Sequence, residues 1–157
     1  MIPADSPAAP RRLAIVSGGF DPLHIGHVRM MHHAAYYGEV CALVNSDAWL
    51  VRKKGIAVSP VEHRLEMVQA LRSVAFAAEA QDDDGTVCSS LRWLREYYPR
   101  IPMFFCNGGD RGRENTPEQP VCEELNIDML WSVGGEDKPE SSSEIMRRIA
   151  AHESRRG

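Results

Sequence analysis

The sequence lacks the features that define several large classes of protein. No stretch of its 157 residues approaches the roughly 18 consecutive apolar residues that a membrane-spanning helix requires. Residues 1–10 are rich in proline and alanine but have no apolar core run, so they do not resemble a signal peptide. A formal net charge of -4 disfavours general nucleic-acid binding, which needs a basic surface. We therefore expect neither a membrane nor a nucleic-acid partner.

Cysteine is scarce and shows no pairing pattern. The four cysteines stand at positions 41, 88, 106 and 122, without a C-x-x-C pair. No grouping of histidine and cysteine has zinc-ligand spacing, so no protein-bound metal is expected. Cys41 and Cys106 lie inside apolar runs, which predicts that they are small buried hydrophobes. This cysteine usage favours a reduced, cytoplasmic protein.

The length and the order of apolar runs predict one domain at residues 12–157, preceded by a flexible leader at residues 1–11. Short apolar runs predict buried strands, at 12–17, 40–44, 74–80, 102–106 and 127–133. Helical spacing and capping residues predict helices, at 26–37, 59–71, 86–98, 116–125 and from 141 onward. Residues 49–55 are interpreted as a basic loop, and Ile145 and Ile149 are expected to face inward. The alternation predicts a layered α/β fold with about five parallel strands.

One stretch carries the strongest chemical signal. Residues 17–27 read Ser-Gly-Gly-Phe-Asp-Pro-Leu-His-Ile-Gly-His and link the first predicted strand to the first predicted helix. A strand, a Gly-rich turn and a helix N-terminus together present backbone N–H groups to a phosphate. His24 and His27 stand three residues apart, so both rings lean to the same side of a first helical turn. The plain alternative is that His27 caps the helix and His24 lies in solvent.

Further polar segments come directly after the other predicted strands. They lie at residues 45–55, 107–113 and 134–143. Ligands of parallel α/β sheets bind beyond the carboxyl ends of the strands, so these segments are expected to meet residues 17–27 in one site.

Residues 18–27 also resemble the G-x-F-D-x-x-H-x-G-H signature of the nucleotidyltransferase superfamily that carries the HIGH motif. The resemblance spans about residues 13–150 and implies a Rossmann-like three-layer sandwich that binds an NTP. It implies that His24 and His27 are catalytic and contact the triphosphate, and that the preceding turn binds the nucleotide. The residues of that turn are Gly18, Gly19 and Phe20.

The segment Asn45-Ser46-Asp47 with Lys54-Gly55 is similar to the V-N-S-D…K-G pattern of bacterial cytidylyltransferases and of the heptose-phosphate nucleotidyltransferase domain. The resemblance implies that Lys54, or else Lys53, neutralises phosphate charge during the reaction. Asp21 and Asp47 are then expected to contact the acceptor.

The segment Glu62-His63-Arg64 followed by Ala70-Leu71 resembles the E-x-R…A-L helix of the same group, which implies that Arg64 faces the nucleotide. The alternative interpretation is an ordinary charged face exposed to solvent.

Two further segments resemble parts of the same superfamily. Asn107-Gly108-Gly109-Asp110 resembles its G-G-D loop, which implies that Gly108, Gly109 and Asp110 hold the nucleoside. Arg111 and Arg113 come next in the chain, and either could reach the phosphate of an acceptor.

Residues 141–145, Ser-Ser-Ser-Glu-Ile, have two interpretations. They form a helix-capping box of Ser141 with Glu144. They also resemble the I-S-S/T-T-x-I motif, which implies that Ser142 and Ser143 hold the nucleotide's β- and γ-phosphates. Glu140 stands where that motif has an aliphatic residue.

The resemblance implies nucleotidyl transfer, in which an acceptor phosphate attacks the α-phosphorus of an NTP and pyrophosphate leaves. CTP with a small phosphorylated alditol or sugar is the first expectation, and ATP is the alternative because the heptose-phosphate branch uses it. Mg²⁺ is expected to arrive with the NTP, and a homodimer is usual in the resembled group. A nucleotide-binding module without turnover is a further alternative.

Overall fold

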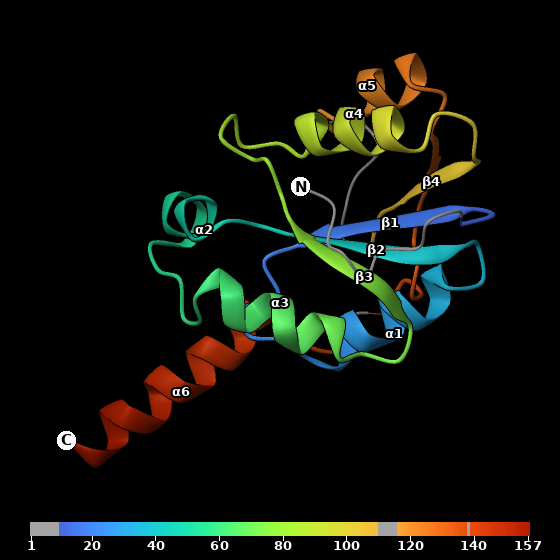
Figure 1. Ribbon diagram of the computed structural model, residues 1–157. Helices are drawn as coiled ribbons and strands as arrows, with labels where there is room; N and C mark the ends of the chain where they lie inside the picture. Colours follow the sequence, from blue (N-terminus) through green and yellow to red (C-terminus); the bar gives the residue numbers. More distant parts are fainter. Residues whose placement is uncertain (1–9, 110–115, 138) are drawn as a thin grey trace.

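The chain is built around one five-stranded sheet in which all neighbouring strands are parallel. The computed structural model describes residues 10–109, 116–137 and 139–157 and is drawn in Figure 1. Its elements are β1 (Leu13–Gly18), α1 (Ile25–Ala34), β2 (Glu39–Val44), α2 (Asp47–Lys54), α3 (Val61–Gln69), β3 (Val74–Glu79), α4 (Cys88–Tyr97), β4 (Met103–Cys106), α5 (Gln119–Glu124), β5 (Asp128–Leu130) and α6 (Ser142–Arg156). The strand order is β3-β2-β1-β4-β5.

Helices cover both faces of the sheet, which gives the predicted three layers (Figure 1). Successive side chains of a strand point to opposite faces, so the strands contribute side chains to two cores, one on each face of the sheet. The first core packs α4 and α5 on the sheet and includes Leu13, Ile15, Leu91, Leu94 and Cys122. The second packs α1 and α3 on the other face and includes Ala14, Val16, Met31, Ala34 and Val68. Burial on both faces explains why the strands read as continuous apolar runs.

The order of the strands creates a switch point between β1 and β4. From β1 the chain winds to β2 and β3, and after β3 it crosses to β4 on the other side of β1. In open parallel sheets, ligands bind in the crevice that such a reversal leaves at the carboxyl ends of the strands. The polar segments 17–27 and 107–109 lie at the ends of β1 and β4.

The predicted α/β fold is confirmed, and one predicted loop is wrong. Residues 49–55 were expected as a loop, but residues 47–54 form helix α2. The Ser46 side chain accepts a hydrogen bond from the Trp49 N–H and so caps this helix. The prediction failed because Asn-Ser-Asp is typical of turns and of helix caps alike.

The start of α3 differs by one residue from the prediction. Pro60 is the N-cap, without a side-chain cap, and the helix begins at Val61. Ser59, which was expected to cap it, instead donates its backbone N–H to Asp21 Oδ1 at 2.9 Å.

Helix α6 begins after Ser141, as predicted, but it projects away from the sheet and the other helices (Figure 1). Ile149 was expected to face inward and is instead 52% exposed. No helix in the described part of the chain is long and apolar enough to cross a membrane. Residues 1–9 of the expected leader lie outside the described residues.

Candidate active site

A cavity of about 650 Å³ lies at the carboxyl ends of β1, β2 and β4. Its volume is typical of a small-molecule site. It brings together eight of the residues predicted for the site, namely Gly18, His24, His27, Lys54, Gly108, Gly109, Ser142 and Ser143. Helices α1, α2 and α6 and the loop after β4 each contribute part of this set.

The histidines cap α1 and line the cavity at the same time. His24 Nδ1 accepts the Gly26 N–H at 3.0 Å, and His27 Nδ1 accepts the His24 N–H at 3.2 Å. The two rings stack with centroids 3.8 Å apart. Because each Nδ1 is an acceptor, the proton of each neutral ring lies on Nε2. The alternative expectation placed His24 in solvent, but His24 is the N-cap of α1, and both capping histidines line the cavity.

The N-terminus of α6 is docked beside the histidine turn. Ser142 Oγ donates to the Pro22 carbonyl at 2.9 Å, and the Ser141 side chain accepts the Glu144 N–H at 3.1 Å. The start of a helix carries partial positive charge and N–H groups that attract anions. Ser143 lines the cavity from the same turn.

Glu140 precedes this turn and brings negative charge to the cavity wall. It accepts the Ser141 N–H at 3.1 Å and pairs with Arg148 at 2.7 Å. Hydrogen bonding from Arg148, and to a smaller extent that from Ser141, lowers the pKa of this carboxyl below its ordinary value. Glu140 is therefore ionised near neutral pH.

The loop after β4 packs tightly against a second glycine-containing loop. A Cβ on Gly109 would lie 2.9 Å from the Gly135 carbonyl oxygen and 3.0 Å from Glu136 Cα, so only glycine fits there. Gly108, Gly109 and Gly135 all line the cavity. Asp110, Arg111 and Arg113, predicted to bind nucleoside or acceptor, lie outside the described residues.

Helix α2 forms one wall of the cavity and brings positive charge to it. Trp49, Lys53 and Lys54 all line the cavity from this helix. The Lys53 ammonium lies 5.9 Å from the centroid of the Trp49 ring, within the range of a cation–π contact.

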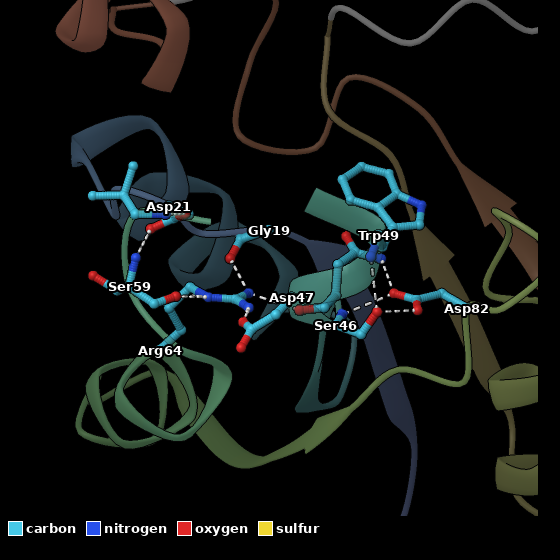
Figure 2. A network of polar contacts seen from close by, with 10 residues as sticks. Gly19, Asp21, Ser46, Asp47, Trp49, Ser59, Arg64 and Asp82 are labelled. Carbon is cyan, nitrogen blue, oxygen red and sulfur yellow. Dashed lines mark hydrogen bonds and ion pairs between the residues drawn. The ribbon is translucent and has the colours of Figure 1, made fainter. Parts of the chain in front are cut away.

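Arg64 is fully buried behind the cavity, so its position does not support the prediction that it faces the nucleotide. Its guanidinium donates to the Gly19 carbonyl at 2.8 Å and to the Asn45 carbonyl at 2.7 Å. It also bonds to Asp47 Oδ1 at 2.6 Å (Figure 2). Arg64 therefore joins the turn after β1 to the start of α2. Asp47 pairs with Arg64 and does not line the cavity.

The turn residues Gly19, Phe20 and Asp21 also lie outside the cavity lining. The buried Phe20 ring packs edge-on against the His27 ring, with centroids 5.0 Å apart. The buried Asp21 carboxylate accepts the Val58 N–H at 2.6 Å and the Ser59 N–H at 2.9 Å. These side chains support the wall that the histidines form, and their positions do not support direct contact with nucleotide or acceptor.

Several cavity residues were missed by the sequence reasoning, among them Arg29, Met30 and Glu118. Met30 lies three residues after His27, at helical spacing, and could have been found from that spacing. Glu118 is buried, and its Oε1 accepts the Val87 N–H at 3.3 Å. It comes from the segment before α5, where the sequence indicated only helix capping, so no local signal identified it.

Comparisons with known proteins agree with this geometry. Residues 15–148 match the Cytidylyltransferase-like family. The Bifunctional protein HldE of Geotalea uraniireducens (strain Rf4) is 32% identical over 149 residues, covering 88% of this chain and 27% of that protein. The HldE of Photorhabdus laumondii is 28% identical over 130 residues, covering 81% of this chain and 24% of that protein. The chain thus spans about a quarter of the length of these curated relatives.

A solved structure shares the fold. The lipopolysaccharide core biosynthesis protein from Thermoplasma volcanium GSS1 superposes with a TM-score of 0.59 at 22% identity, covering 78% of this chain and 94% of that one. The family match indicates a nucleotidyltransferase. This chain belongs to the cytidylyltransferase-like family.

Proposed function

We propose that the protein transfers a nucleoside monophosphate from an NTP to the phosphate of a small phosphorylated alditol or sugar. An oxygen of the acceptor phosphate attacks the α-phosphorus, the bond from that phosphorus to the bridging oxygen breaks, and pyrophosphate leaves with the electron pair. The observation that carries this proposal is the pair of histidines whose Nδ1 atoms are both occupied, beside the start of α6 in one cavity. That arrangement offers N–H donors and positive potential to a polyphosphate.

The proposed roles are argued from position. His24 and His27 donate from Nε2 to oxygens of the α-phosphate and of the departing pyrophosphate. The start of α6, with Ser142 and Ser143, attracts the β- and γ-phosphates. Lys54 neutralises charge between the two substrates from the α2 wall. The acceptor is already an anion near neutral pH, so positioning and charge neutralisation supply the catalysis without a general base.

Mg²⁺ fits this scheme as a partner of the nucleotide. Among the described residues, no group of three or more His, Cys, Asp or Glu side chains could hold a metal ion. The nearby carboxylates of Asp21 and Asp47 are occupied by backbone N–H groups and by Arg64. Mg²⁺ keeps several waters and binds mainly through substrate phosphates in such sites, which relieves phosphate charge.

Two nucleotides are candidates. The V-N-S-D, K-G and G-G-D segments favour CTP, and the heptose-phosphate branch that the same segments resemble uses ATP. We would measure the shift in Tm with CTP, ATP, GTP and UTP, each with Mg²⁺, because stabilisation grows with the ratio of free ligand to Kd. A selective shift with CTP supports cytidylyl transfer, and one with ATP supports adenylyl transfer. No shift with any nucleotide would contradict the proposal.

Turnover separates the enzyme from a non-catalytic nucleotide-binding module. The preferred nucleotide is incubated with a panel of alditol and sugar phosphates, and pyrophosphate release is recorded. Release that depends on the acceptor supports transfer. Nucleotide binding without pyrophosphate release in the presence of any acceptor of the panel would favour the non-catalytic binding module.

A further inference from the structure

Helix α2 carries Lys53 and Lys54, two of the cations that line the cavity, but has little to hold it in place by itself. It is eight residues long, and Leu50 is its buried residue. Isolated helices of this length are unstable in water, so the position of α2 depends on contacts with neighbouring segments. Lys53 and Lys54 lie in its last turn, where a small tilt of the helix moves them furthest.

Asp82 holds the start of this helix. The residue lies shortly after β3 and is 2% exposed, and it does not line the main cavity. Its Oδ2 accepts the Asn45 side-chain N–H and the Ser46 backbone N–H, each at 2.9 Å, and its Oδ1 accepts the Ser46 hydroxyl at 2.6 Å. Figure 2 shows the Asp82 carboxylate directed at Ser46 beside Trp49.

Ser46, which Asp82 binds, is itself hydrogen-bonded to helix α2. The Ser46 oxygen that donates to Asp82 also accepts the Trp49 N–H at 3.0 Å, which caps α2. Arg52 donates to the Asp82 carbonyl at 2.9 Å, and the Trp49 indole N–H donates to the Gly85 carbonyl at 3.1 Å. The segment 82–85 therefore fixes α2 through its cap, through one cavity-lining side chain and through its last turn.

We propose that Asp82 is a positioning residue for the reaction, which acts through α2 and sets where Lys54 meets the substrates. The inference rests on the proposed function for its catalytic consequence. The nucleotide phosphates are assigned to α1 and α6, which Asp82 does not contact, so its loss is expected to impair transfer to the acceptor far more than nucleotide binding.

The test replaces Asp82 with asparagine, which keeps the size but turns an N–H₂ group toward the donors of Asn45 and Ser46. Asp82→Asn is expected to lower kcat/KM for the acceptor by about 10- to 100-fold, the cost of a small misplacement of a catalytic group. The Kd of the nucleotide, measured by calorimetry, stays within about 2-fold of the unmodified protein, less than 0.5 kcal/mol. Asp83→Asn is the matched control, since Asp83 is exposed in the same loop.

A double-mutant cycle with Lys54→Ala tests the route of action. If Asp82 acts through Lys54, adding Asp82→Asn to Lys54→Ala lowers kcat/KM by less than about 3-fold further, because coupled residues are not additive. The same loss in both backgrounds, a parallel loss of nucleotide binding, or an Asp82→Asn variant with full activity would each overturn the proposal.

Hydrogen exchange separates this inference from the proposed function. Asp82→Asn is expected to speed amide exchange in residues 46–55 at least 10-fold while residues 13–18 stay protected. If no acceptor supports pyrophosphate release, the proposed function fails, and unchanged exchange in residues 46–55 would overturn the positioning role independently.

Discussion

His24 and His27 owe their proposed chemistry to the groups that occupy their Nδ1 atoms. Each Nδ1 accepts a backbone N–H of the α1 cap, so the ring proton is placed on Nε2. The same hydrogen bonds fix the orientation of both rings, and the Phe20 ring makes a T-shaped contact with the His27 ring. In the proposed mechanism, folding and catalysis therefore use different nitrogens of each side chain.

Two substitutions at His27 distinguish the role of Nδ1 from that of Nε2. His27→Asn retains an acceptor near the Nδ1 position, whereas His27→Gln retains a donor near Nε2. We expect His27→Asn to lower kcat by about 10²–10³-fold, as the loss of one charge-stabilising donor does. His27→Gln should keep more of the activity. Steady-state pyrophosphate release measures both, and equal activity of the two variants would contradict the Nε2 assignment.

Arg64 is a residue on which the fold itself depends. Its buried guanidinium satisfies the Gly19 and Asn45 carbonyls and pairs with Asp47. Arg64→Met leaves those buried acceptors without their donor, so the free energy of unfolding should fall by roughly 3 kcal/mol.

Urea denaturation monitored by circular dichroism measures this loss. Arg72→Met is the control, because Arg72 is exposed in the turn that follows α3, the helix of Arg64, and should change stability by less than about 0.5 kcal/mol. Similar losses for the two variants would show that Arg64 is not the link between the β1 turn and α2.

At the scale of elements, two helices present opposite ends to the site. α2 presents its C-terminal turn with Lys53 and Lys54, and α6 presents its N-terminal turn with Ser142 and Ser143. Lysines offset the negative end of α2, while the positive end of α6 is left to attract an anion. Glu140 counteracts that attraction, because it accepts the Ser141 N–H at the same helix start.

Removing the charge of Glu140 should therefore tighten nucleotide binding. We expect Glu140→Gln to favour NTP binding by about 0.3–1 kcal/mol, a roughly 2- to 5-fold lower Kd, as measured by calorimetry. Glu153→Gln, on the exposed part of α6, is the control and should leave the Kd unchanged.

The lowered pKa of Glu140 determines how its effect on nucleotide binding should depend on pH. Arg148 lowers the pKa of Glu140, so the carboxylate stays charged at pH values where an ordinary glutamate begins to gain protons. The difference in Kd between the unmodified protein and Glu140→Gln should persist from about pH 8 to about pH 5. At about pH 4.3, where an ordinary glutamate is half protonated, most of the difference should remain, and a difference already halved there would mean that the Arg148 pair does not hold in solution.

At the scale of the whole molecule, the two cores keep the thiols neutral. Burial raises the pKa of Cys41, and it raises the pKa of Cys106 and Cys122 to about 12. The thiolate is the reactive form, so these three should be inert in the folded protein, while the half-buried Cys88 reacts.

A thiol-specific chromogenic disulfide reagent measures the accessible cysteines. We expect one fast equivalent in native buffer and four in denaturant, with Cys88→Ser removing the fast phase. Rapid reaction of Cys106, which lines the cavity, would instead show that the floor of the site opens in solution.

Strong local patterns in the sequence were enough to predict much of the fold and part of the site. Continuous apolar runs and helix caps predicted the sheet and its layers, and the strand ends predicted where His24, Lys54 and Ser143 would meet. Positions decided by long-range contacts could not be predicted from local patterns. Arg64 resembles an exposed charge until the carbonyls of Gly19 and Asn45, distant in sequence, are brought around it.

The most direct test of the central claim traces the α-phosphorus of the nucleotide. The protein is incubated with α-³²P-labelled CTP or ATP, Mg²⁺ and each phosphorylated acceptor, and the products are separated by chromatography. We predict that the label appears in a nucleoside-diphosphate-linked acceptor in step with pyrophosphate release, and that both fall together in His27→Asn. Label released only as free nucleoside monophosphate, with no acceptor-linked product, would contradict the assignment as a nucleotidyltransferase of this kind.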